Sequence, residues 1–231
     1  MVFFAFLFYN GGMNIQDLIN ESKAVLFDMD GVIIDSDSLH DEAKRGAVDF
    51  CGIQIEESEW QKIRHYTSVQ IYDWLVEQYP DIKIKKEEFI AEKSRIFSEI
   101  APIKIQDIRG AFKFVRYLKS KNIKTALVTA SRKDTLGIVY QKFKLDDYFD
   151  VILTREDVEN VKPDPEAYLK AAKLLEVRPE DCTVVEDAVL GVQSGKSAGC
   201  KVIGRASAVT QEVLTEAGAD AVFVNYEELP N

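Results

Sequence analysis

Cysteine is scarce in this sequence, and the few cysteines form no recognisable pattern. There are 3 cysteines in 231 residues, at Cys51, Cys182 and Cys200. An odd number at such wide spacings excludes the disulfide framework of a small secreted domain, and none of the spacings is typical of a zinc site. We therefore expect the protein to work in a reducing compartment, the cytoplasm.

Long apolar runs and an excess of positive charge are also missing. The apolar run Val2–Tyr9 is too short to cross a bilayer, and it lacks the basic region and cleavage site of a signal peptide. Lys and Arg number 29 against 39 Asp and Glu, so the formal net charge is -10 at pH 7. Because this balance repels polyanions, we expect neither nucleic acid nor a membrane as a partner.

Residues 1–22 form a leader ahead of the first predicted strand. Its apolar part, residues 1–12, has two open explanations: a misassigned upstream start codon, or a segment that packs onto the fold or a partner. This segment, together with Trp60 and Trp74, is a candidate surface for association. We expect a monomer or a weak homodimer.

Hydrophobic periodicity divides the rest of the chain into two kinds of structure. After Ser36, apolar residues recur at three- and four-residue steps, which predicts four helices with no strand between them, the last ending before Pro102. From Ile108 onward, helices and apolar strands alternate. We predict helices at 108–121, 133–143, 165–176 and 189–199, and strands at 124–129, 150–153, 182–186, 201–204 and 221–224. Such alternation is typical of a parallel, doubly wound sheet.

These patterns predict an α/β fold in which a doubly wound, Rossmann-like parallel sheet carries a small inserted all-α domain. The predicted core comprises residues 23–36 and 108–231. The predicted helical cap domain comprises residues 37–107, joined to the core by linkers near 36–38 and 101–108.

The most informative stretch is the apolar run Ala24–Phe27 followed by Asp28-Met29-Asp30-Gly31. The apolar run predicts a strand buried on both faces. Open α/β sheets bind ligands just beyond the carboxyl ends of their strands, which is where Asp28 and Asp30 fall. Two such close negative charges need a counter-charge, for which a divalent metal is suited. The alternative is a solvated turn that happens to contain two aspartates.

Three further motifs each follow a run of apolar residues. They are the hydroxyl residue Thr129, Lys162 within a Lys-Pro-Asp-Pro segment, and the acidic pair Glu186-Asp187. With Asp28-Met29-Asp30-Gly31 they resemble the four-motif signature of the haloacid dehalogenase (HAD) superfamily, over about residues 23–224. The nearest subgroup is the one with β-phosphoglucomutases, phosphoglycolate phosphatases and a four-helix cap. One such motif is a weak indication, whereas four in this order are highly specific.

The resemblance implies catalytic roles for four residues. Asp28 would be the nucleophile that forms an aspartyl-phosphate, and Asp30 would protonate the leaving alkoxide and then activate water. Spacing alone permits these two roles in either order. Thr129 would hydrogen-bond a phosphoryl oxygen, and Lys162 would bring positive charge to the phosphoryl group and the nucleophile. The structural alternatives are a β-branched strand end for Thr129 and a surface lysine for Lys162.

The resemblance also implies Mg²⁺ as the cofactor. Its ligands would be the carboxylates of Asp28 and Asp187 and the backbone carbonyl of Asp30. Glu186 would be a second acidic ligand or a partner through water. Hard oxygen ligands in small number suit Mg²⁺, which keeps several of its waters.

Further residues are candidates for substrate binding. Gly31 lets the backbone turn tightly near the phosphate, and Ala130 and Ser131 offer backbone N–H donors where the next helix begins. His40 lies where related proteins carry a histidine on the first cap helix. A lone helical histidine is often structural instead.

One difference from the resembling mutases bears on the reaction. Those enzymes carry an arginine in the second cap loop that grips the distal phosphate of a bisphosphate. The matching position here is Ser68, although Arg64 is close in sequence. A mutase must hold a diphosphorylated intermediate with cationic groups, so this difference favours a simple phosphatase.

We therefore predict a Mg²⁺-dependent phosphatase that hydrolyses a small phosphorylated metabolite, of the sugar phosphate or phosphoglycolate type, through an aspartyl-phosphate. One alternative is a β-phosphoglucomutase-like phosphosugar mutase, which would require a sugar bisphosphate activator. The other is a catalytically silent binding protein on the same fold, against which the intact motif residues argue.

Overall fold

The computed structural model describes residues 14–230, which fall into two compact units. One unit comprises residues 36–106, and the other comprises the chain before and after it. The apolar segment 1–12, with its two explanations, lies outside the described residues. Within residues 14–230, no helix combines the length and apolarity that a bilayer crossing demands.

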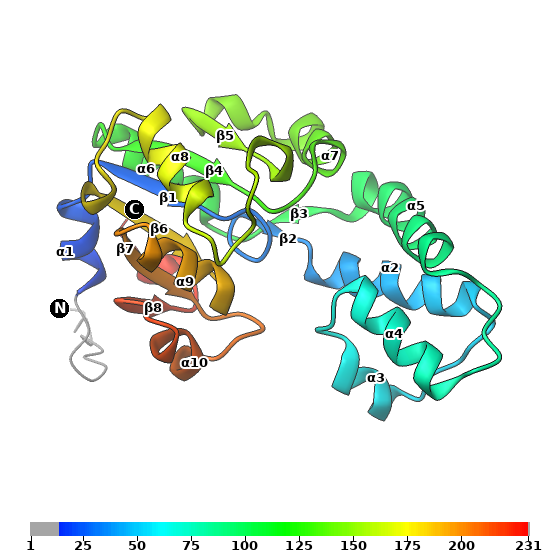
Figure 1. Cartoon of the computed structure of the whole chain (residues 1–231). Helices are drawn as coiled ribbons and strands as arrows, with labels where there is room; N and C mark the ends of the chain where they lie inside the picture. The colour runs from blue at the N-terminus through cyan, green and yellow to red at the C-terminus, as the bar shows by residue number, and fades with distance from the viewer. Residues whose placement is uncertain (1–13, 231) are drawn as a thin grey trace, which may run out of the picture. The chain divides into compact units, whose positions relative to one another are not determined.

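The larger unit is built on a six-stranded parallel sheet with the order β5-β4-β1-β6-β7-β8 (Figure 1). Its strands are β1 (Ala24–Phe27), β4 (Lys124–Val128), β5 (Val151–Leu153), β6 (Cys182–Glu186), β7 (Lys201–Arg205) and β8 (Ala221–Phe223). The chain leaves β1 toward β4 and β5, then crosses to the other side of β1 and adds β6, β7 and β8. The predicted doubly wound sheet is confirmed, and the direction of winding reverses at β1, where ligands bind in such sheets.

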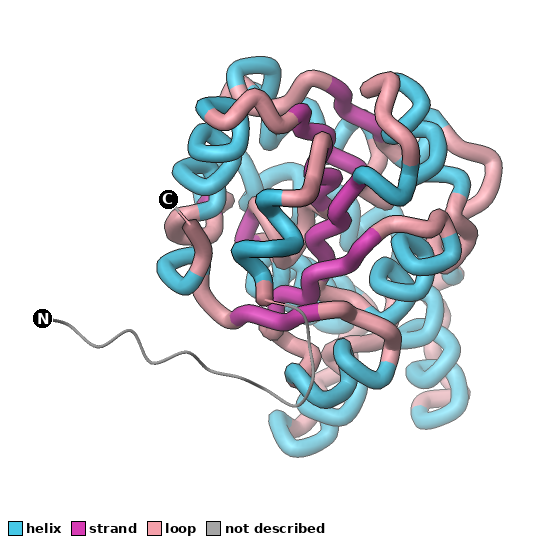
Figure 2. Tube along the Cα trace, turned by 90° about the vertical axis from the view of Figure 1, so that its left-hand side faces the viewer, coloured by secondary structure: helices cyan, strands magenta, loops and turns pink. Residues whose placement is uncertain are grey.

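Helices lie on both sides of this sheet (Figure 2). They are α1 (Ile15–Asn20), α6 (Ala111–Ser120), α7 (Lys133–Phe143), α8 (Glu166–Leu174), α9 (Val189–Ser197) and α10 (Gln211–Glu216). Leu26 of β1 belongs to a buried cluster with Tyr168 of α8 and Val192 of α9. Its neighbour Phe27 points the other way, with its ring centroid 6.1 Å from that of Phe114 in α6. Because β1 is buried on both faces, it needs apolar residues at successive positions.

Several helix boundaries differ from the prediction, and positive φ angles explain those of α6 and α8. Helix α6 begins at Ala111 and not at 108, because Gly110 has a φ of 89° and so stands outside the helical region. Helix α8 ends at Leu174, and Glu176 has a φ of 55°, which cannot continue a right-handed helix. Short 3₁₀ turns occur at η1 (Leu145–Asp147), η2 (Arg155–Asp157), η3 (Pro179–Asp181) and η4 (Tyr226–Glu228).

The smaller unit contains the four predicted helices around a core of its own. They are α2 (Asp37–Phe50), α3 (Glu57–Ile63), α4 (Ser68–Gln78) and α5 (Lys86–Lys104). Trp60, Ile71 and Phe89 are all buried in this core, so the expectation that Trp60 contributes to a surface for association was wrong.

The predicted end of the fourth helix was wrong, because α5 continues through Pro102 to Lys104. Proline removes one helical hydrogen bond, the one to the carbonyl four residues earlier. That carbonyl belongs to Ser98, which is exposed, so water can satisfy it. The next turn still closes, since the Ile105 amide donates to the Ala101 carbonyl at 2.9 Å.

The two connections between the units contain short strands that the sequence did not predict. Strands β2 (Ile34–Asp35) and β3 (Gln106–Asp107) pair as a separate two-stranded sheet. Two residues are too few for a strand pattern to be recognised.

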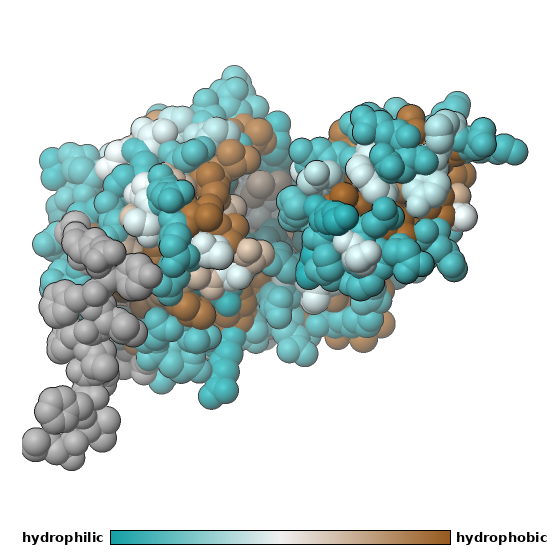
Figure 3. All heavy atoms as spheres, turned by 90° about the horizontal axis from the view of Figure 1, so that it is seen from below, coloured by the Kyte–Doolittle hydropathy of each residue, from teal (hydrophilic) through white to brown (hydrophobic). Residues whose placement is uncertain are grey.

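The view in Figure 3 shows a mainly hydrophilic surface, with apolar residues reaching it in places. The large apolar side chains that solvent reaches include Ile103, Leu174 and Leu190. Exposed residues of this kind are normal in folded proteins.

Candidate active site

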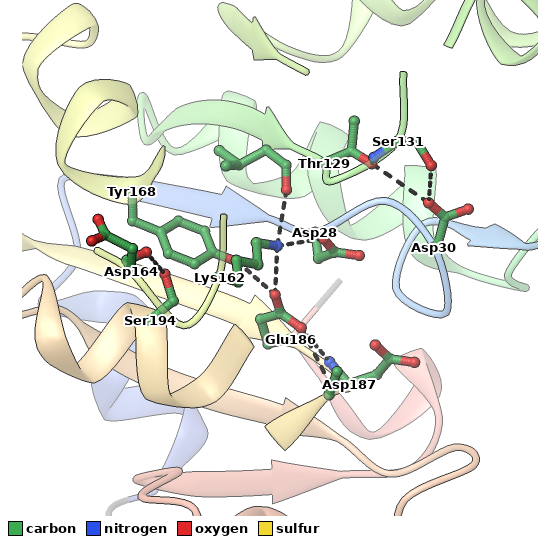
Figure 4. A network of polar contacts seen from close by, with 12 residues as sticks. Asp28, Asp30, Thr129, Ser131, Lys162, Asp164, Tyr168, Glu186, Asp187 and Ser194 are labelled. Atoms are coloured by element: carbon green, nitrogen blue, oxygen red, sulfur yellow. Dashed lines mark hydrogen bonds and ion pairs between the residues drawn. The ribbon is translucent and has the colours of Figure 1, made fainter. Parts of the chain in front are cut away.

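The parallel register brings three of the predicted motifs to the same edge of the sheet. Phe27 of β1 is level with Leu127 of β4 and with Val185 of β6. Asp28, which follows β1, therefore lies between the ends of its two neighbouring strands (Figure 4). Its amide donates to the Val185 carbonyl at 3.0 Å, and only 8% of the residue is exposed.

Lys162 comes from the loop between β5 and α8 and points into this edge. Its Nζ lies 2.5 Å from Asp28 Oδ1 and 2.6 Å from Glu186 Oε1, and it donates to the Val128 carbonyl at 3.2 Å. With 11% of its side chain exposed, Lys162 is not an ordinary surface lysine. Burial disfavours its charge, but Asp28 and Glu186 outweigh burial and hold the pKa of Lys162 well above its ordinary value. Lys162 is therefore a fixed positive charge.

Asp28 carries more negative charge around it than Lys162 alone balances. Burial raises the pKa of Asp28 and Lys162 lowers it, while Glu186, Asp30 and Asp187 raise it further. The resulting pKa is well above the ordinary aspartate value. A site of this kind gains from additional positive charge.

The acidic residues here fit a divalent cation. Asp28, Glu186 and Asp187 each offer a carboxylate oxygen, and these atoms all lie within 4.8 Å of one another. Oxygen donors of this type match the preference of Mg²⁺ and Ca²⁺, and not the nitrogen and sulfur donors of structural zinc sites.

Within this cluster the Glu186 carboxylate accepts four hydrogen bonds. Glu186 is 1% exposed. Its Oε1 accepts from Lys162 at 2.6 Å and from the Tyr168 hydroxyl at 2.7 Å. Its Oε2 accepts from the amides of Asp187 and Ala188 at 3.1 and 3.3 Å. Glu186 thus holds Lys162, and a cation bound here would draw mainly on the other two carboxylates.

Asp187 lies against the tight turn that follows Asp30. A Cβ atom on Gly31 would lie 1.9 Å from Asp187 Oδ2, and Gly31 has a φ of +70°. Glycine is therefore required at this position both by the turn and by the approach of the carboxylate. The Ser207 hydroxyl also donates to Asp187 Oδ2, at 3.0 Å.

Asp30 faces the end of β4. Its Oδ2 accepts a hydrogen bond from the Ser131 hydroxyl at 2.8 Å and a long one from Thr129 Oγ1 at 3.5 Å. The Ser131 amide, predicted as a donor to phosphate, donates to Thr129 Oγ1 at 2.9 Å. Ala130 is exposed between them. Ser131 is therefore placed to orient the Asp30 carboxylate.

His40 belongs to the helical unit, where its neighbours can be described. Its ring stacks on Phe97 with centroids 4.4 Å apart, and Lys93 Nζ lies 3.0 Å from its Nδ1. Its predicted role in substrate binding stays a prediction. Arg64, the arginine close in sequence to Ser68, has its Nε 3.6 Å from Asp41 Oδ1. Because Asp41 already balances its charge in part, Arg64 would bind a phosphate less strongly.

Sequence reasoning missed several residues at the strand ends. Tyr168 was hidden because a buried tyrosine in an apolar helix face looks like core. Ser207 and Arg205 follow or end β7, which carries no motif, yet Arg205 Nη1 donates to the Gly31 carbonyl at 2.6 Å. The rule that ligands bind at strand carboxyl ends was the one signal that could have found these two residues.

Comparison with known proteins agrees with this arrangement. Residues 25–205 match the family model described as haloacid dehalogenase-like hydrolase. A phosphorylated carbohydrates phosphatase of Thermotoga maritima is 35% identical over 215 residues, which cover 90% of this chain and 97% of the relative. A β-phosphoglucomutase of Bacillus subtilis is 29% identical over 192 residues, covering 79% of this chain and 82% of the relative.

Solved structures give the same result. The crystal structure of a HAD hydrolase of family IA, variant 3, from Entamoeba histolytica has a TM-score of 0.76 and 30% identity, covering 90% of this chain and 95% of the other. Since the family model spans more than half of the residues and a family IA structure of 30% identity shares the fold, the chain belongs to the haloacid dehalogenase-like hydrolases, subfamily IA.

Proposed function

We propose that this hydrolase is a phosphatase that removes the phosphoryl group from a small phosphorylated carbohydrate, with Asp28 as the nucleophile. The observation that carries the proposal is the buried Asp28 carboxylate held 2.5 Å from the Lys162 ammonium group, beside the acidic residues that suit a metal. The T. maritima relative, named a phosphorylated carbohydrates phosphatase, supports the substrate class.

The reaction takes place in two displacements. First, an Asp28 carboxylate oxygen attacks phosphorus, the bond from phosphorus to the ester oxygen breaks, and protonated Asp30 gives its proton to the leaving alkoxide. Then Asp30 takes a proton from a water molecule whose oxygen attacks phosphorus. The bond to Asp28 breaks, and inorganic phosphate leaves.

The neighbouring residues hold these groups in place. The Ser131 hydroxyl donates to Asp30 Oδ2 at 2.8 Å, so the carboxyl group is held near the end of β4, where the proposed phosphoryl ligand Thr129 lies. Lys162 lies against Asp28, where it can attract both the phosphoryl oxygens and the nucleophile.

The proposed cofactor is Mg²⁺, held by the carboxylates of Asp28 and Asp187, with the Asp30 backbone carbonyl as a third protein ligand. When bound, it would neutralise phosphoryl oxygens and so let one anion approach another. Glu186 is proposed as a partner of Lys162 and not as a direct ligand, because its oxygens already accept four hydrogen bonds.

Replacing Asp187 tests the metal site. Asp187→Ala should raise the Mg²⁺ concentration for half-maximal activity at least about tenfold, because it removes a charged ligand. The measurement is a Mg²⁺ titration of phosphate release. Asp220→Ala, which removes a surface carboxylate paired with Lys196, is the control and should leave the titration unchanged. An unaltered Mg²⁺ dependence in Asp187→Ala would move the metal site elsewhere.

The proposed activity is tested by phosphate release from a panel of phosphorylated sugars and phosphoglycolate, with and without Mg²⁺. Each substrate is also tested with a trace of glucose 1,6-bisphosphate. We expect Mg²⁺-dependent release from one or more sugar phosphates without the bisphosphate. Isomerisation that requires the bisphosphate would identify a mutase, and the absence of any reaction would favour the binding-protein alternative.

A further inference from the structure

We propose that Tyr168 is a positioning residue that orients Glu186. Through Glu186 it also positions the Lys162 ammonium group, whose charge serves the attack of Asp28 on phosphorus. This inference rests on the proposed phosphatase function. It adds to the site a side chain from helix α8, which none of the four sequence motifs contains.

The first observation is the hydrogen bond itself. The Tyr168 hydroxyl donates to Glu186 Oε1 at 2.7 Å, and this same oxygen accepts from Lys162 at 2.6 Å (Figure 4). Tyr168 is 0% exposed and Glu186 is 1% exposed, so water does not compete for this oxygen. A buried hydrogen bond to a charged acceptor is among the stronger ones in proteins.

The second observation is how closely Glu186 is enclosed. A Cβ atom on Gly191 would lie 1.9 Å from Glu186 Cδ and 1.9 Å from its Oε1, so the carboxylate lies directly on the backbone of α9. Its Oε2 is held by the amides of Asp187 and Ala188. The Tyr168 hydroxyl closes the remaining side, at Oε1, and so prevents the carboxylate from rotating.

The third observation concerns Lys162. Its Nζ lies 5.0 Å from the centre of the Tyr168 ring, in addition to its contacts with Asp28 and Glu186. Tyr168 therefore contacts both members of the Lys162–Glu186 pair. If Glu186 turned, Lys162 would follow it, and the positive charge would leave the position from which it attracts the phosphoryl group.

A purely structural role is the competing explanation. Tyr168 belongs to the buried cluster that α8 forms with the sheet, and its ring fills space there. The two roles belong to different atoms, however. Ring packing is preserved when the hydroxyl is removed, whereas Tyr168 acts on the orientation of Glu186 only through its hydroxyl.

Tyr168→Phe separates these roles because it removes only the hydroxyl group. We expect kcat to fall about tenfold with KM changed less than twofold, since the lost interaction acts on the transition state. Orthovanadate, a mimic of the transferring phosphoryl group, should bind about tenfold more weakly when its binding is measured directly. This binding needs no turnover, so it tests Tyr168 even if no substrate of the panel reacts. The absence of any reaction would count against the proposed function and not against the role of Tyr168.

Tyr226→Phe is the matched control. Tyr226 is 2% exposed, and its hydroxyl donates to the Val32 carbonyl at 2.9 Å, outside the Lys162–Glu186 pair. This variant also loses a buried tyrosine hydroxyl and should lose a similar amount of thermal stability. Its kcat and its orthovanadate affinity should stay within about twofold of the wild type.

A double-mutant cycle then tests whether Tyr168 acts through Glu186. In a Glu186→Ala background, Tyr168→Phe should change kcat and orthovanadate affinity less than twofold, because the acceptor that the Tyr168 hydroxyl orients is gone. Equal losses in both backgrounds would overturn the proposal, since Tyr168 would then act independently of Glu186. An unchanged kcat and orthovanadate affinity in the single variant would overturn it as well.

Discussion

Asp28→Asn should lower turnover by a factor on the order of 10⁴ or more while leaving the fold intact. The amide cannot attack phosphorus as the carboxylate can, so the proposed aspartyl-phosphate should not form. In the wild type, acid quenching during turnover of a radiolabelled phosphomonoester should leave label on the protein. The variant should carry none.

The stability of this variant can be predicted from its surroundings. Asp28 is buried near Glu186, Asp30 and Asp187, and its pKa is raised above that of the unfolded chain. Protonation of Asp28 therefore contributes to the stability of the fold. This contribution is fully present below the ordinary aspartate pKa of about 4, and it is lost as pH rises through the higher pKa of the folded state. A neutral amide avoids that loss, so without metal the variant should melt no lower than the wild type at pH 7.

Two further variants make this test decisive. Asp28→Ala guards against activity regained by deamidation of the new asparagine. Asp181 directly precedes β6, at the end of the strand away from the site, and its carboxylate pairs with Lys23 and Arg178. Asp181→Asn removes this carboxylate and should keep activity within about twofold. Substantial turnover in both Asp28 variants would remove Asp28 from the nucleophile role.

The order of the motifs and the kind of sheet could be predicted because both follow from one-dimensional patterns. The strands of a parallel sheet are buried on both faces, so β1 is a continuous apolar run, and β6, buried throughout, has Val184 and Val185 at its centre. Their carboxyl ends meet at one edge, so residues that end such runs come together even when far apart in sequence. Lys162 and Asp28, separated by 134 positions, are an example.

What could not be predicted depends on contacts between side chains with no shared pattern. The Glu186 carboxylate was expected at or near the metal, but its hydrogen bonds to Tyr168, Lys162 and two backbone amides are visible only in three dimensions. The contact of His40 with Lys93 spans 53 positions between two helices. Pro102 was taken as a helix end because proline usually is one, and the exposure of Ser98, four residues earlier, cannot be read from the sequence.

Replacing Lys162 should affect both activity and stability. Lys162→Met keeps the approximate length of the side chain and removes the charge that lies 2.5 Å from Asp28 and 2.6 Å from Glu186. Two buried carboxylates then face each other without a counter-charge, which should cost about 3 kcal/mol of unfolding free energy in the metal-free protein. Loss of the charge proposed to attract the phosphoryl group should lower kcat by about 10² to 10³. The measurements are denaturant unfolding and steady-state phosphate release.

The physical cause of the instability can be isolated by adding metal. Because a divalent cation at Asp28 and Asp187 would supply part of the missing positive charge, Mg²⁺ should stabilise Lys162→Met more than it stabilises the wild type. The control Lys196→Met removes a lysine that is 38% exposed and paired with Asp220, and it should cost less than about 1 kcal/mol. If Lys162→Met were as stable as Lys196→Met and equally indifferent to Mg²⁺, then the Asp28–Lys162–Glu186 cluster would not carry the charge balance argued for it. The assignment of Lys162 as the charge that serves both nucleophile and phosphoryl group would fail with it.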